Sequence, residues 1–132
     1  HGLWEGKLEE EIKKDWSELL QKWQASPEEV QMPQGENIQE VWERSVECWA
    51  EITSSLKENE TGIVVAHDAV NKTILCHLLG LKPSNIWMIK QGNGGITIID
   101  IYLENNKPNI LTCLNITSHL GGVIDQTATG AL

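Results

Sequence analysis

The sequence predicts an α/β fold, in which helices pack against a β-sheet. Three observations support this prediction: two amphipathic helical patterns come first, a short β-type run then leads directly into a third helix, and two further β-type runs follow. Elements mixed in this order pack as layers around one core. The 132 residues are about one domain's worth, and a hydrophobic share of 40% is enough for such a core.

Two helices are expected before residue 57. Apolar residues recur at helical spacing between 6 and 24, with acidic residues and lysines between them. The connection 25–37 contains two prolines and a glycine, which interrupt regular structure. A second amphipathic pattern follows and extends to Leu56, and Asn37 is a good N-cap for it.

Three strands are expected in the rest of the chain. The run "IVVA" at 63–66 is short, β-branched and flanked by turn residues, which is typical of a buried strand. Two more runs, at 96–103 and 110–117, are separated by a polar turn. The glycine- and threonine-rich end, 119–132, is expected to be a loose tail.

His67 lies where the first predicted strand meets the third helix, which is expected to begin near Ala69 and to end at Gly80. Ligands of open α/β sheets bind beyond the carboxyl ends of the strands. A helix N-terminus offers free N–H groups and a partial positive charge, which suit a phosphate or a carboxylate. His67 is therefore a candidate catalytic residue. In the alternative interpretation His67 is a structural residue, and Asp68 is only the helix N-cap.

Four segments, in order, resemble the histidine phosphatase superfamily, the phosphoglycerate-mutase-like group. The stretch "VVAHDAVNKTILCHLLGL", 64–81, is similar to the second-histidine motif of this family. "GLWEG" at 2–6 resembles the segment after its acidic residue, and "PQGENIQEVWERS" at 33–45 resembles the start of one of its helices. "GNGGITIID" at 92–100 resembles a strand entered through an asparagine. In character the sequence is nearest to cyanobacterial and plastid members related to carboxyarabinitol-phosphate phosphatases.

The resemblance implies a three-layer phosphoglycerate-mutase-like sheet with helices on both faces. It also implies a two-histidine phosphoryl transfer, in which one histidine of an Arg-His-Gly motif attacks phosphorus and an acid protonates the leaving oxygen. The second histidine, matched by His67, binds the phosphoryl group as its charge spreads over the equatorial oxygens. The candidate phosphate- or substrate-binding residues are His67, Asp68 and Asn93. In the alternative interpretation, Asn93 is an ordinary turn residue at a glycine-rich strand entry. The implied reaction is phosphomonoester hydrolysis, or mutase transfer, on a small sugar or organic-acid phosphate, with no metal or other cofactor.

The chain departs from this family pattern in one large respect. It contains no Arg-His-Gly motif, and its only His-Gly pair is His1-Gly2, with no strand before it. We therefore interpret 1–132 as the C-terminal two-thirds of one such domain, lacking the N-terminal strand or strands that carry the nucleophile. Two hypotheses remain: a phosphatase or mutase whose phosphohistidine comes from the missing part, and an inactive phosphatase-like binding or scaffolding module.

An incomplete sheet would leave an apolar face and strand edges to be covered. We expect the missing N-terminal segment or a second chain to cover them. The phosphoryl-transfer interpretation further requires His67 to lie at the tip of a buried strand, beside a cleft. A segment around Val64 and Val65 that faced solvent would argue against it.

Other polar residues have simpler interpretations. Glu5 is expected to be structural, Glu36 to stabilise the start of the second helix, and Arg44 to form an ion pair. His77 lies about three turns along the third helix, too far to share the site. His119 lies in the predicted tail, where the sequence identifies no partner for it.

The composition restricts the possible partners. A net charge of −9 and a pI near 4.8 disfavour nucleic acid and anionic membranes, but they permit a small phosphorylated metabolite that contacts only its own pocket. No apolar run reaches the roughly 18 residues of a membrane span, and no signal peptide is visible. No histidine or cysteine spacing indicates zinc. Three scattered cysteines favour reduced thiols and a cytoplasmic location.

Overall fold

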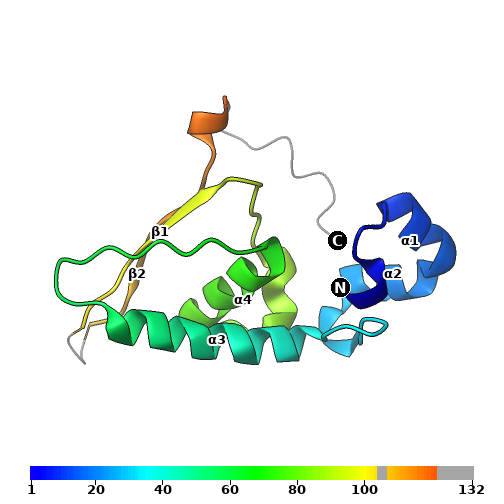
Figure 1. Cartoon of the computed structure of the whole chain (residues 1–132), viewed down its shortest axis with the longest axis horizontal. Coiled ribbons are helices and arrows are strands. Elements are labelled where there is room, and N and C mark those ends of the chain that lie inside the picture. The colour runs from blue at the N-terminus through cyan, green and yellow to red at the C-terminus, as the bar shows by residue number, and fades with distance from the viewer. Residues whose placement is uncertain (104–106, 122–132) are drawn as a thin grey trace.

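The structure, a computed structural model, describes residues 1–103 and 107–121. The helices are α1 (Glu9–Asp15), α2 (Ser17–Ala25), α3 (Ile38–Ser55) and α4 (Asp68–Leu78), and the strands are β1 (Ile96–Asp100) and β2 (Ile110–Ile116). Short 3-10 helices are η1 (Gly2–Trp4), η2 (Pro27–Glu29), η3 (Pro83–Met88) and η4 (Ser118–Leu120). Figure 1 shows α1 and α2 at one end of the molecule and the strands toward the other, with α3 extending between them. Within the described residues, no helix has both the length and the apolar character needed to cross a bilayer.

The first predicted helix is divided in two at Trp16. This residue has φ −138° and ψ 41°, so it ends α1 and also precedes α2. Its backbone N–H still donates to the carbonyl of Ile12 at 2.7 Å, and its carbonyl accepts from Leu20 at 2.9 Å. The turn at Trp16 allows Ile12 of α1 and Leu20 and Trp23 of α2 to be buried in the same core.

Helix α3 confirms the second predicted helix. The side chain of Asn37 accepts the backbone N–H of Glu40 at 2.9 Å, and the Glu40 carboxylate accepts the backbone N–H of Asn37 at 2.8 Å. This reciprocal capping box satisfies two amide groups that the helix itself leaves free. The predicted N-cap is therefore confirmed.

The core joins the N-terminal helices to α3, α4 and η3. Its main cluster consists of Trp4, Ile12, Leu20, Trp23, Val30, Met32, Ile38, Leu75, Cys76, Ile86 and Ile89. Helix α4 is the most deeply buried of these elements, since every residue from Lys72 to Cys76 is buried. The packing around α4 therefore fixes the position of its first turn, directly behind His67.

The two predicted strands after residue 90 are confirmed, although β1 ends at Asp100, earlier than predicted. They pair antiparallel, with Asp100 opposite Ile110. Ile99 and Leu111 pack against the core. Apolar side chains also project into solvent from these strands, namely those of Ile96, Ile98, Ile110 and Leu114.

The prediction of a buried strand at 63–66 is wrong for the described residues. Ile63 is 88% exposed and Val65 is 91% exposed, and neither belongs to a strand. Among the described residues, the one hydrogen bond to this segment runs from the Asn71 side chain to the carbonyl of Ala66, at 2.9 Å. A β-branched run becomes a strand only where neighbouring backbones accept and donate its hydrogen bonds, and no described segment does so here. The described residues consequently hold a two-stranded sheet rather than the expected three-layer one.

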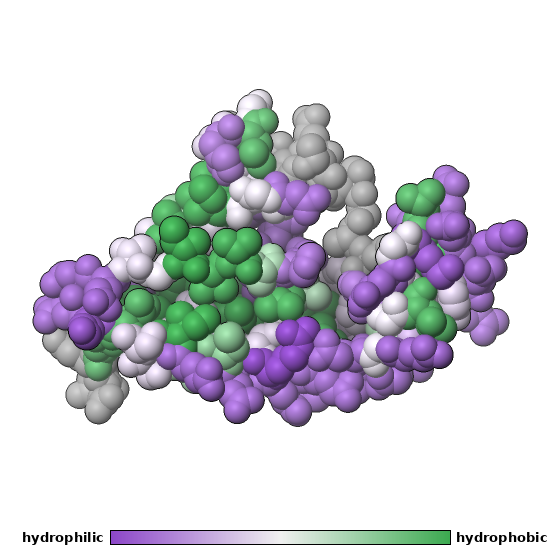
Figure 2. All heavy atoms as spheres, in the orientation of Figure 1, coloured by the Kyte–Doolittle hydropathy of each residue, from purple (hydrophilic) through white to green (hydrophobic). Residues whose placement is uncertain are grey.

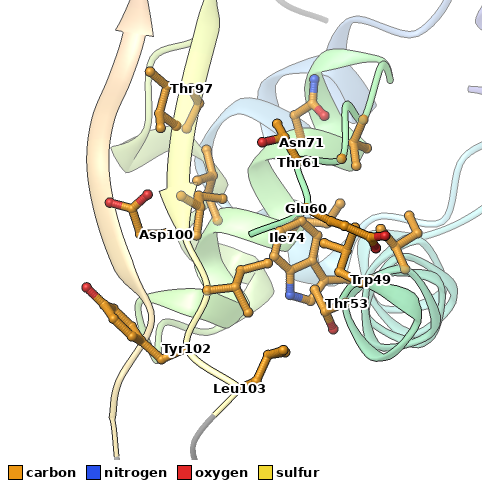
Figure 3. Close-up of a pocket in the computed structure, with 18 of the residues that line it drawn as sticks. Trp49, Thr53, Glu60, Thr61, Asn71, Ile74, Thr97, Asp100, Tyr102 and Leu103 are labelled. Carbon is orange, nitrogen blue, oxygen red and sulfur yellow. The ribbon is translucent and has the colours of Figure 1, made fainter. Parts of the chain in front are cut away.

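A cleft of about 850 Å³ lies between β1 and the segment that comprises 56–62 and Val64. Figure 3 shows Trp49 of α3 and Ile74 of α4 beside it, with Thr97 and Asp100 of β1 across from them. Figure 2 shows apolar side chains gathered on the face of the molecule that the 63–66 segment crosses. The described residues therefore leave an apolar, partly hollow face open to solvent.

The predicted loose tail, 119–132, lies outside the described residues from 122 onward. Its first residues belong to η4. There Nε2 of His119 lies 3.0 Å from the carbonyl oxygen of Gly94. The partner that the sequence did not identify is thus a backbone group in the turn before β1.

We expect Val65→Lys to change the free energy of unfolding of this chain by less than about 0.5 kcal/mol, because the side chain is already in solvent. Ile86→Ala, at a residue that is 1% exposed, should cost about 2–5 kcal/mol. Urea unfolding of both variants measures the difference. A Val65→Lys variant as unstable as Ile86→Ala would show that 63–66 is buried.

Candidate functional site

His67 is the N-cap of α4 and its side chain is exposed. Its backbone has φ −73° and ψ 162°, and its carbonyl accepts the Asn71 N–H at 3.0 Å, which begins the helix. The His67 side chain makes no capping hydrogen bond to the first turn of α4 within the part of the chain that the structure describes. The backbone N–H groups of that turn are free, and they carry the partial positive charge of the helix. The predicted junction of His67 with a helix is confirmed. Its expected place at the tip of a buried strand is wrong for the described residues, and His67 is not among the residues that line the cleft beside β1.

Asp68 is the first residue of α4, so the alternative in which it is the N-cap is wrong. Its Oδ2 lies 2.8 Å from Nζ of Lys72, one turn further on, while its buried Oδ1 has no partner among the described residues. Lys72 is 4% exposed, and its ammonium lies 4.9 Å from the centre of the Trp87 ring. Sequence reasoning missed Lys72. The available signal was a lysine four residues after an aspartate, two residues before the apolar run 74–76 of the same helix.

Asn93 is exposed in the turn before β1. Two hydrogen bonds shape this turn: Gly95 N–H donates to the Gly92 carbonyl at 2.9 Å, and Gly92 N–H donates to the Asn115 side chain at 2.8 Å. In the described part of the chain, no hydrogen bond joins Asn93 to His67 or Asp68. The role of Asn93 in phosphate binding stays a prediction.

Glu36 and Arg44 form the ion pair that the sequence predicted for Arg44. The guanidinium donates twice to the carboxylate, at 2.6 and 2.9 Å. This hydrogen-bonded guanidinium lowers the pKa of Glu36, and Glu36 in turn raises the pKa of Arg44. Both side chains are about half exposed, so we assign the pair to the start of α3 rather than to the site.

The other polar candidates lie away from His67 in the sequence and have local contacts. Glu5 is exposed, with its carboxylate 3.5 Å from the terminal amine of His1. His77, in the last turn of α4, packs edge-on against the Trp42 ring. Neither contact includes a residue of the first turn of α4. The structural interpretations of Glu5 and His77 stay predictions.

The described residues hold no group of three metal-ligating side chains. Cys76, in the last turn of α4, offers little nucleophilic chemistry, because burial raises the pKa of its thiol. What His67 and the first turn of α4 can do is bind an anion. The imidazole can donate a proton or a hydrogen bond, and the free amides can donate to the same oxygens.

Comparison with known proteins places the chain in a family. The sequence model of the protein family named histidine phosphatase superfamily (branch 1) matches residues 1–114 of this chain. The chain belongs to this superfamily. The resemblance of the sequence to that family is thereby confirmed.

The histidine phosphatases most similar in sequence include phosphoserine phosphatase 1 of Hydrogenobacter thermophilus, which is 32% identical over 121 residues. That match covers 92% of this chain and 56% of the relative. The 2-carboxy-D-arabinitol-1-phosphatase of Triticum aestivum is 30% identical over 111 residues, covering 84% of this chain and 22% of the relative. The chain therefore spans about half, or less, of the length of these curated relatives.

A solved structure shows the same fold over part of a domain. The α-ribazole phosphatase from Shigella flexneri matches with a TM-score of 0.69 at 22% sequence identity. The match covers 86% of this chain and 55% of that one. The histidine phosphatase fold is thus present in this chain over part of its usual extent.

We expect Glu36→Gln to lower the free energy of unfolding at neutral pH by no more than about 1 kcal/mol, because the ion pair is exposed. Arg44 lowers the folded-state pKa of Glu36. The stability that the ion pair contributes is therefore fully present at pH values above 4.5, the pKa of Glu36 in the unfolded chain. This stability is lost as the pH falls through the folded-state pKa of Glu36. Urea unfolding at neutral and at strongly acidic pH measures it, and an equal difference at both pH values would contradict the pairing.

Proposed function

We propose that this chain supplies the second-histidine portion of a histidine phosphatase domain that acts on a small phosphorylated organic acid or sugar. One observation carries the proposal: an exposed His67 stands directly before the uncapped first turn of α4, in a chain that belongs to this superfamily. The names of two relatives, a phosphoserine phosphatase and a carboxyarabinitol phosphatase, support phosphomonoester hydrolysis and a substrate that also carries a carboxylate. Mutase transfer is the related alternative.

The proposed role of His67 follows from the charge of the reacting group. A transferring phosphoryl group spreads negative charge over three equatorial oxygens. Donors that already point at those oxygens lower the energy of the transition state without reorganising. In this proposal, His67 and the free amides of α4 are such donors, and Asp68 and Asn93 line the same pocket. The phosphohistidine would form on a nucleophile in the part of the domain that this chain does not span.

The exposure of 63–66 argues against the phosphoryl-transfer role of His67 in this chain alone, because His67 does not follow a buried strand in the described residues. We propose that a strand from the remainder of the domain pairs with 63–66 and fills the cleft beside β1, so that 1–132 is the C-terminal portion of a three-layer domain. The unpaired backbone of this segment, its exposed apolar side chains and the partial coverage of the relatives support this proposal. A second copy of the chain is the alternative occupant.

A second candidate function is supported by one observation, the absence of an Arg-His-Gly motif from the sequence. A domain without that nucleophile would bind phosphorylated ligands without turning them over. It would then be a phosphatase-like binding or scaffolding module.

His67→Ala should abolish saturable binding of inorganic phosphate by this chain, because it removes the side-chain donor at the α4 N-terminus. His77→Ala, at the other end of the same helix, should bind phosphate like the wild type. Phosphate-dependent shifts in a heteronuclear NMR spectrum measure both. Loss of binding in both variants, or in neither, would place the anion elsewhere.

The same substitution separates the two candidate functions in a protein that carries this chain together with the rest of the domain. Hydrolysis of p-nitrophenyl phosphate, reduced about 100-fold or more in kcat by His67→Ala, is expected for the enzyme. Phosphate binding without any hydrolysis by the wild type would instead support the binding module.

Val65→Lys tests the proposed strand. In the complete domain this substitution should cost about 2 kcal/mol or more, because a charged side chain would replace a buried apolar one. In this chain alone it should cost almost nothing. Equal, small costs in both proteins would reject the strand, and a concentration-dependent dimer of this chain in sedimentation equilibrium would favour the second copy.

A further inference from the structure

Lys72 is a buried, charged residue that has no role in the phosphate-binding site proposed above. It lies on α4 and is 4% exposed, which is rare for a lysine. Removing an ammonium from water costs several kcal/mol unless close partners compensate for the lost hydration. A buried lysine one turn from the candidate site therefore calls for a specific partner set.

The partners of Lys72 connect the first turn of α4 to two other segments. Its ammonium contacts the Asp68 carboxylate at 2.8 Å and lies over the Trp87 ring of η3 at 4.9 Å. Nε1 of Trp87 donates to the carbonyl of Trp23 in α2 at 3.0 Å, and the two indole rings pack edge to face. Trp23 is itself 3% exposed. A continuous chain of contacts thus runs from Asp68 into the core.

The residues on both sides of His67 are anchored. On the C-terminal side, the Asp68 carboxylate is held by the Lys72 ammonium. On the N-terminal side, the carbonyl of Ala66 accepts a hydrogen bond from the Asn71 side chain at 2.9 Å. The imidazole is exposed although its flanking residues are anchored, which is the arrangement expected of a positioned functional group.

We propose that Lys72 is a positioning residue, which fixes His67 and the first-turn amides of α4 through Asp68 and Trp87. This inference rests on the proposed phosphate-binding role of His67. Lys72 does not bind the anion itself, because its ammonium is buried and occupied by Asp68 and Trp87. Asp68, in turn, acts as the anchor of the helix start. It borders the proposed pocket but does not donate to the phosphate, and its pairing with Lys72 offsets the repulsion that its carboxylate would otherwise exert on the anion.

The test measures the position of His67 separately from stability. Lys72→Met leaves the Asp68 carboxylate without any partner among the described residues, so it should destabilise the fold. Removing both charges in the Asp68→Asn/Lys72→Met double variant should restore much of the stability. Lys72→Arg keeps the charge. Lys14→Met, at an exposed lysine of α1, is the matched control.

Two readouts are followed for each variant: the affinity for inorganic phosphate, and the imidazole Cε1–H signal of His67 without phosphate. We expect Lys72→Met and the double variant to weaken phosphate binding about tenfold, because small displacements of a positioned group are costly. Both should also shift the His67 signal. Lys72→Arg should keep most of the affinity, and Lys14→Met should match the wild type.

Recovery of both stability and phosphate affinity in the double variant would overturn the proposal, since Lys72 would then serve folding alone. Unchanged affinity in Lys72→Met would overturn it as well. If Lys72→Met does not fold, the double variant carries the test. If the wild type binds no phosphate, the proposed function fails, while the His67 signal still decides whether Lys72 positions that residue.

Discussion

The burial of α4 is the constraint on which the rest of the structure depends. Its residues from Lys72 to Cys76 are all buried, and Leu75 and Cys76 belong to the main core cluster together with residues of α2 and η3. An α-helix satisfies its own backbone hydrogen bonds, so packing one face is enough to fix it in place. Once α4 is fixed, so is its first turn, where the candidate site begins. Packing and proposed chemistry are thus linked through one helix.

Much of the fold could be predicted because its signals are local. Asn37 and Glu40 form a capping box that can be recognised from their spacing, and α3 follows from its apolar period. The position of His67 directly before a helix was predicted in the same way. Each of these features depends on residues within a few turns of one another.

The features that could not be predicted depend on distant partners. A β-branched run such as 63–66 has the composition of a strand, but its pairing must come from another segment, and none of the described segments provides it. The turn at Trp16 is set by how α1 and α2 share one core. The burial of Lys72 depends on Trp87, fifteen positions away in the sequence. Periodicity alone gives no information about such contacts.

The open 63–66 segment also affects how molecules of this chain behave toward one another. Uncharged, β-branched runs with unpaired edges are the segments from which cross-β aggregates start. At pH 7 the net charge of −9 keeps molecules apart by mutual repulsion, and that repulsion vanishes near the pI of about 4.8. Colloidal stability of the chain thus depends on its acidic surface and should be poorest in mildly acidic solution.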